Sequence, residues 1–265
     1  MRRTGRLRLP LALLAALLLG ACAGPTLRLD TRHSAQAQAS RVQFLILHYT
    51  SEDEARSLQV LTEGPVSSHY LVGDGDPPVV YRLVDEDRTA FHAGASEWQG
   101  RRFLNASAIG IEIVNAGWRD GPDGRTWAPY PPSQVGAVVA LVRDVVRRHD
   151  IRPDRVLAHS DIAPGRKQDP GPLFPWQRLA DEGLVRWPDA AAAQAARPGF
   201  EAVLPGADWF QDRLARVGYA VPRSGVHDEA TRQVLQAFQM KYRPARHDGE
   251  PDAETAALLQ ALTSP

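Results

Sequence analysis

Apolar and polar positions follow two different periods along this chain, and together they predict a mixed α/β body. Residues 42–47 form a near-continuous apolar run, which predicts a strand buried on both faces. Residues 108–114 alternate strictly, so the isoleucines share one face of a strand and Glu112 lies on the other. Over residues 133–149 the apolar positions recur at helical spacing, which predicts a helix with Ser133 as its N-cap.

Shorter patterns extend this body. Residues 68–72 and 79–83 are strand-like and flank a Gly/Asp-rich turn, which predicts a hairpin. Residues 156–158 form another short apolar run, and a loop rich in Pro and Gly follows over residues 164–175. Strands and helices in this order predict an α/β fold, with a mixed sheet flanked by helices over residues 41–188.

A second, smaller domain is predicted at the C-terminus. An alanine-rich stretch between two prolines has the composition of a linker with some helical character, over residues 189–205. Beyond it, Asp228 and Asp252 each stand three residues before a threonine at the start of an apolar-periodic segment. These helix-start signals predict a three-helix domain over residues 206–265.

The N-terminus has the zones of a bacterial export signal over residues 1–21: basic residues, a short apolar stretch and then small residues. The apolar stretch is too short to span a bilayer. Residues 19–22 resemble a lipobox, in which Cys22 is lipidated, although a plain signal peptide with a chance cysteine fits the same residues. Residues 22–40 are small and polar, which predicts a flexible tether.

Charge and cysteine content limit the classes of binding partner and the cellular compartment that we expect. The 265-residue chain has a formal net charge of 0, and loss of residues 1–21 removes four arginines and no acidic residue, leaving −4. This balance does not predict a nucleic-acid partner. Cys22 is the single cysteine, so no disulfide is expected within the chain. By resemblance to lipoprotein sorting rules, Ala23 predicts a periplasmic protein anchored to the outer membrane of a Gram-negative bacterium.

Three residues are candidates for a zinc site. His48 follows the first predicted strand, His159 follows residues 156–158, and Asp169 lies in the loop beyond. Imidazole nitrogens and a carboxylate oxygen suit zinc, and three protein ligands leave a fourth position for water, as in catalytic sites. Spacing alone is weak evidence, because a lone histidine at a strand end is more often a packing residue. Asp161 is a nearby alternative ligand, with capping or orientation of the loop as its other possible role.

The local sequence around these residues is more specific. Residues 47–50, 110–113 and 158–172 resemble the zinc N-acetylmuramoyl-L-alanine amidases, whose fold is shared with phage amidases and peptidoglycan recognition proteins. The resemblance extends over about residues 41–188. It is strongest in the third segment, where a histidine, a lysine, an aspartate and Pro-Gly-Pro occur together.

The resemblance implies a role for each residue. One zinc ion per chain would be bound by His48, His159 and Asp169, with Glu112 as catalytic acid/base and Lys167 as cationic stabiliser. Amide cleavage needs these types, since a carboxylate can move the proton of the attacking water and a fixed cation can stabilise the oxyanion. Lys167 is also one of only two lysines among 31 basic residues.

Further residues lie in segments that resemble cleft-lining parts of the same family. His69, His92 and Asn105 are therefore candidates for substrate contact, with support of the surrounding loops as the alternative. The C-terminal segment resembles the three-helix peptidoglycan-binding domain, chiefly through residues 225–231 and 237–239.

The predicted function is zinc-dependent hydrolysis of the amide between N-acetylmuramic or anhydro-muramic acid and L-alanine, which releases stem peptides from peptidoglycan. The expected partners are peptidoglycan or muropeptides and, through the lipid, the outer membrane; the chain is expected to be a monomer. Two alternatives stay open: a wall-binding lipoprotein without activity, and a zinc peptidase that cuts within the stem peptide.

Overall fold

The computed structural model describes residues 27–122 and 124–264, and the chain from Ser40 onward forms one compact unit. The predicted export segment and Cys22 lie outside the described residues. Within the described part, no helix has the length and apolar character that a membrane crossing requires.

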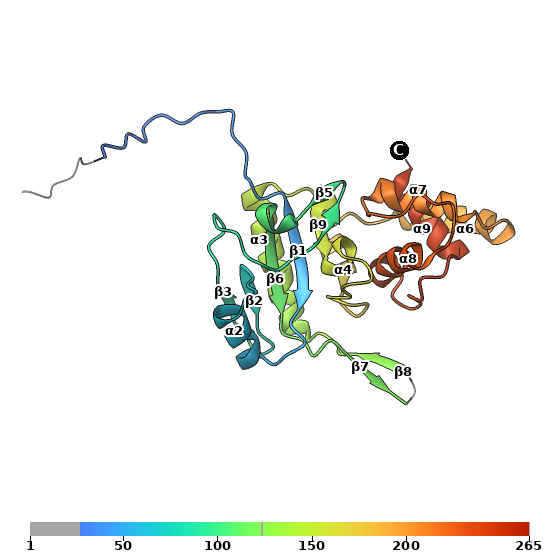
Figure 1. Ribbon diagram of the computed structural model, residues 1–265, viewed down its shortest axis with the longest axis horizontal. Helices are drawn as coiled ribbons and strands as arrows, with labels where there is room; N and C mark the ends of the chain where they lie inside the picture. Colours follow the sequence, from blue (N-terminus) through green and yellow to red (C-terminus); the bar gives the residue numbers. More distant parts are fainter. Residues whose placement is uncertain (1–26, 123, 265) are drawn as a thin grey trace, which may run out of the picture. The chain divides into compact units, whose positions relative to one another are not determined.

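A five-stranded sheet with strand order β3-β2-β6-β1-β9 forms the centre of this unit (Figure 1). Strand β1 (Phe44–Tyr49) lies between β6 (Ala108–Ile113) and β9 (Val156–Ala158), and all three run parallel. Strand β2 (Tyr70–Val72) pairs parallel with β6 and antiparallel with β3 (Val80–Arg82). These pairings confirm the predicted strands and hairpin, and the sheet is mixed as expected.

One face of the sheet packs against helix α3 (Pro132–His149) through a buried apolar cluster. Ile109, Ile111 and Ile113 belong to this cluster, so the alternation in β6 correctly predicted that Glu112 lies on the opposite face. The prediction that Ser133 caps the helix was wrong. The helix begins one residue earlier, at Pro132, because a proline suits the first turn, where its missing N–H needs no partner.

The C-terminal helices are α7 (Ala207–Val217), α8 (Glu229–Tyr242) and α9 (Ala253–Thr263). Asp228 and Asp252 cap α8 and α9 as predicted, each accepting a hydrogen bond from the backbone N–H three residues later, at 2.8 Å. The predicted linker is mostly a fourth helix, α6 (Ala190–Ala202), which packs against α9. A continuous apolar cluster joins these helices to the sheet; its members include Phe44, Leu157, Phe210, Phe238 and Leu262.

Several short elements complete the unit and had no clear sequence signal. Helix α2 (Glu54–Glu63) is capped by Asp53, whose side chain accepts from the Arg56 N–H. The others are a few residues long, too short for a period to be seen: β4 (Glu97–Trp98), β5 (Arg101–Arg102), η1 (Leu104–Ser107), β7 (Trp118–Gly121), β8 (Gly124–Trp127), η2 (Pro153–Arg155), α4 (His159–Ile162) and α5 (Trp176–Ala180).

Candidate active site

The three candidate metal ligands meet at the carboxyl end of neighbouring parallel strands. His48 is in β1, and His159 comes directly after β9 as the first residue of α4. Asp169 follows in the next loop, which is tied back to α4 because the Ser160 N–H donates to the Asp169 carbonyl at 3.0 Å. Parallel strands end at one edge of a sheet, so this topology brings together residues more than 100 positions apart.

Their side chains converge on one point. The His48 and His159 Nδ1 atoms are 2.9 Å apart, and the Asp169 Oδ2 atom lies 3.1 Å from the first and 2.9 Å from the second. All three residues are buried. The group can therefore hold a metal ion with two imidazole nitrogens and one carboxylate oxygen.

The second nitrogen of each imidazole has its own partner. His48 Nε2 lies 3.0 Å from His92 Nδ1, and His159 Nε2 lies 3.2 Å from the Ala93 carbonyl. If each Nε2 carries the proton, as these partners favour, both Nδ1 lone pairs face the carboxylate. Three lone-pair donors directed at one point form a set that a cation satisfies, and fixed tautomers of this kind support metal binding.

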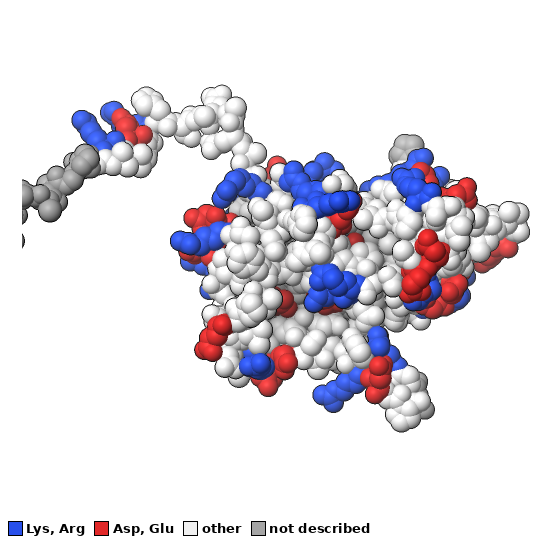
Figure 2. Space-filling view, viewed as in Figure 1, with Lys and Arg blue, Asp and Glu red and all other residues white. Residues whose placement is uncertain are grey.

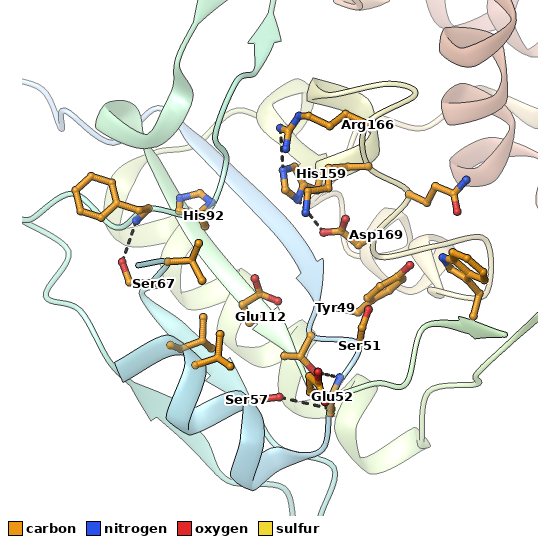
Figure 3. Close-up of a pocket in the computed structure, with 18 of the residues that line it drawn as sticks. Tyr49, Ser51, Glu52, Ser57, Ser67, His92, Glu112, His159, Arg166 and Asp169 are labelled. Atoms are coloured by element: carbon orange, nitrogen blue, oxygen red, sulfur yellow. Dashed lines mark hydrogen bonds and ion pairs between the residues drawn. The ribbon is translucent and has the colours of Figure 1, made fainter. Parts of the chain in front are cut away.

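Glu112 faces this group from β6. It is the register partner of His48, and Figure 3 shows its carboxylate projecting into the cleft across from His159 and Asp169. The cleft has a volume of about 540 Å³, and one Glu112 oxygen has no hydrogen-bond partner among the described residues. Burial and the neighbouring Asp169 charge raise the pKa of Glu112 well above its usual range.

Three further ionisable residues of the site are Lys167, His48 and Asp169. Lys167 is half-buried in the cleft wall, and its charge lowers the pKa of Glu112 against the effects of burial. Burial and nearby His159 lower the pKa of His48 to about 4, so its imidazole is neutral at neutral pH, as a ligand requires. Burial alone would raise the pKa of Asp169, but His159 and His48 outweigh it and hold this carboxyl ionised.

The three candidate substrate contacts differ in position. His92 lines the cleft, whereas the side chains of His69 and Asn105 are not among the lining residues. His69 Nδ1 accepts from the Gly110 N–H at 3.0 Å, within the fold. Asn105 Oδ1 accepts from the backbone N–H groups of His92 and Ala93, at 3.1 and 2.7 Å. These contacts place His69 and Asn105 as supports behind the cleft wall.

Sequence reasoning missed several residues of the cleft wall. Arg166 donates to the carbonyl of Ala93, which also bonds His159, at 2.8 Å. Trp118 and Arg125 come from the β7–β8 hairpin, with the guanidinium 3.6 Å from the indole centroid. The dipeptide Asp123-Gly124 is a hairpin signal in the sequence that would have drawn attention to this wall. Figure 2 shows basic and acidic side chains interspersed on the visible face.

The sheet, the two-histidine carboxylate group and the facing glutamate define a hydrolase with a metal-capable site. A family model described as N-acetylmuramoyl-L-alanine amidase matches residues 38–172, and one for a peptidoglycan binding domain matches residues 205–259. The chain is 43% identical to the N-acetylmuramoyl-L-alanine amidase AmiD of Escherichia coli over 94% of both chains.

Solved structures agree with this comparison. AmiD of E. coli in complex with anhydro-N-acetylmuramic acid-L-Ala-D-γ-Glu-L-Lys has a TM-score of 0.80 at 42% identity, covering 88% of this chain and 93% of that one. AmpDh3 of Pseudomonas aeruginosa in complex with anhydromuramic pentapeptide has a TM-score of 0.81 at 40% identity, covering 89% and 97%.

The chain belongs to the N-acetylmuramoyl-L-alanine amidase family. It is an enzyme that hydrolyses the amide between N-acetylmuramic acid and L-alanine in peptidoglycan. As a peptidoglycan amidase it acts where that polymer is found, which in a Gram-negative cell is the periplasm.

Proposed function

We propose that this amidase is zinc-dependent, with one zinc ion bound by His48 Nδ1, His159 Nδ1 and Asp169 Oδ2. The observation that carries this proposal is the convergence of these three atoms within 3.1 Å of one another, opposite the half-buried Glu112. Two imidazoles and one carboxylate form a ligand set typical of catalytic zinc, which keeps a position for water or substrate. When bound, zinc supplies Lewis acidity to the water and to the substrate carbonyl.

Glu112 is the proposed acid/base. Its carboxylate takes a proton from the attacking water as the new carbon–oxygen bond forms, and delivers a proton to the amide nitrogen as the carbon–nitrogen bond breaks. The products are the lactyl carboxylate of the muramic acid and a peptide with a free L-alanine amine. The raised pKa of Glu112 favours this role, because a carboxylate with a higher proton affinity is a stronger base toward the attacking water.

Lys167 is the proposed stabiliser of the oxyanion that develops on the carbonyl oxygen. Lys167 lines the same cleft as Glu112, and its backbone N–H donates to the Ala163 carbonyl at 3.0 Å. A fixed donor at such a position contributes about 3–4 kcal/mol to transition-state stabilisation.

The proposed substrates are muropeptides and peptidoglycan with either ordinary or anhydro-muramic acid. The solved complexes of AmiD and AmpDh3 contain anhydro-muramyl peptides, and this chain resembles both proteins over most of its length. His92 is the proposed substrate contact among the residues singled out in the sequence, because its ring lines the cleft.

The proposed location is the periplasmic face of the outer membrane, with Cys22 lipidated and residues 22–40 as the tether. An acylated cysteine and a C-terminal peptidoglycan-binding domain, proposed over residues 206–265, would together raise the local concentration of wall around the enzyme. Radiolabelled palmitate should enter the wild-type protein in Gram-negative cells, and Cys22→Ser should abolish this labelling. Labelling of the serine variant would contradict anchoring through Cys22.

Digestion of purified sacculi tests the reaction itself. We expect free stem peptides with an N-terminal L-alanine, no such peptides after treatment with a chelator, and their return on addition of zinc. Fragments cut inside the stem peptide would instead establish a peptidase. Binding to sacculi without any product would establish an inactive wall-binding protein, and metal analysis of the purified protein would separate that outcome from loss of zinc.

A further inference from the structure

A buried ion pair connects the C-terminal helices to the turn that presents His159. Asp161 is fully buried, at 0% exposure, and Lys241 of α8 is 3% exposed. Lys241 Nζ donates to Asp161 Oδ2 at 2.8 Å, and the hydroxyl of Tyr219 donates to Asp161 Oδ1 at 2.5 Å. Both donors come from the C-terminal region, more than 55 positions along the chain from their acceptor.

The same groups bond to the backbone of β9, just before that turn. Asp161 Oδ2 also accepts from the Ala158 N–H at 2.9 Å, immediately before His159, and Lys241 Nζ donates to the Val156 carbonyl at 3.2 Å. Helix α4 is only four residues long and begins at His159, so it has little rigidity of its own. Figure 1 shows α4 between the sheet and α8.

The surroundings make this pair important for the local structure. A buried carboxylate needs a compensating charge, and Lys241 supplies it, with its Nζ also 4.2 Å from the centroid of the Trp176 ring. The Tyr219 ring packs edge-to-face against the Trp98 ring, with 4.9 Å between the ring centroids. Tyr219 and Trp98 both belong to the continuous apolar cluster, which fixes their side chains relative to the sheet.

We propose that Lys241 and Tyr219 are positioning residues for the metal site, and that the C-terminal helices are therefore part of the catalytic unit. They act through Asp161, which holds the β9-to-α4 turn and with it the ring of His159. The inference rests on the proposed role of His159 as a zinc ligand. It assigns the C-terminal region a task beyond wall binding.

Zinc affinity of the full chain, measured by competition with a chromogenic chelator, tests this inference. Tyr219→Phe removes one hydroxyl and Lys241→Met removes the charge while keeping an apolar stem. Supporting partners of metal ligands typically change affinity by 10–100-fold, so we expect a loss in that range for each variant. Tyr242→Phe is the matched control, because its hydroxyl contacts the Arg186 carbonyl at 3.4 Å and not Asp161.

The outcomes are separable. Zinc affinity within twofold of wild type in folded Tyr219→Phe would overturn the inference, even if the melting temperature of the zinc-free protein falls, because that result describes a purely structural contact. If Lys241→Met does not fold, Tyr219→Phe alone decides, since loss of one hydroxyl leaves the apolar core intact. Failure of the wild-type protein to bind zinc would overturn both this inference and the proposed zinc site.

Discussion

His48 and Glu112 are register partners on neighbouring parallel strands, so the candidate ligand and the candidate acid/base lie side by side on one face of the sheet. Side chains at paired positions of adjacent strands project in the same direction. The sheet thus fixes the positions of His48 and Glu112 relative to each other.

Replacement of Glu112 by glutamine should leave zinc bound but remove most turnover. The amide keeps the size of the side chain but cannot accept the proton of the attacking water, and general acid/base catalysis typically contributes 10²–10⁴-fold. Measurement of kcat on a soluble muropeptide, with zinc content determined on the same sample, checks this prediction. A near-wild-type kcat would remove Glu112 from the mechanism.

Loss of the Lys167 charge should change both the rate and its pH dependence. Lys167→Met should lower kcat/KM by about 10²–10³-fold, the typical cost of losing one oxyanion donor. Because Lys167 lowers the pKa of Glu112, its removal should raise that pKa further. As the pH falls, Glu112 would then lose its base form at a higher pH. The acidic limb of the kcat/KM profile should therefore shift to higher pH.

Lys167→Arg is the matched control, because it keeps the positive charge. Its acidic limb should stay close to that of the wild type, even if its rate falls through altered geometry. A shift of the acidic limb to lower pH in Lys167→Met would contradict the proposed coupling between Lys167 and Glu112.

Asn105 should act on metal binding, since its side chain holds the His92-Ala93 segment that bonds both candidate histidine ligands. Asn105→Ala leaves two partly buried N–H groups without their acceptor and should weaken zinc affinity by about 10–100-fold. KM, measured with zinc in excess, should change little. A raised KM at unchanged zinc affinity would instead make Asn105 a substrate contact.

A methyl group at Gly110 should disturb the cleft wall. A Cβ there would lie 2.5 Å from Cγ of the His92 ring, so Gly110→Ala should displace the ring that bonds His48. We expect a loss of about 1–3 kcal/mol in the free energy of unfolding, measured with urea, as for overpacking elsewhere.

Gly136→Ala gives the control for that substitution. Gly136 is exposed on α3, where an added Cβ meets nothing within 4 Å, and alanine favours the helix by about 1 kcal/mol. The free energy of unfolding of Gly136→Ala should therefore be equal to or higher than that of the wild type. Equal stability of Gly110→Ala and the wild type would show that the His92 ring is not confined by β6.

Removal of residues 206–265 should impair hydrolysis of soluble muropeptides as well as binding to sacculi. The truncation exposes the part of the apolar cluster that lies on the sheet, and it removes Lys241 from beside Asp161. An unpaired buried charge typically costs about 3–5 kcal/mol. Circular dichroism and kcat/KM on a soluble muropeptide check this prediction, and a folded truncation with wild-type kcat/KM would contradict it.

Local patterns accounted for much of the fold. The strands, the long helix and the caps at Asp228 and Asp252 were predictable because period and capping chemistry depend on neighbouring residues. The α6 helix was predicted mainly as a linker, since its alanine-rich composition lacks a strong apolar period. The cap of α3 was misplaced because Ser133 and Pro132 both suit a helix start.

For the site, the sequence by itself determined the face of Glu112 and, through resemblance, singled out His48, His159 and Asp169 as candidate metal ligands. The tertiary structure decided which imidazole nitrogens converge and moved His69 and Asn105 behind the cleft wall. It also separated the two lysines, with Lys167 in the cleft and Lys241 paired with Asp161 in the core. The physical reason is distance along the chain, because contacts between segments 80 or more positions apart leave no periodic trace in one sequence.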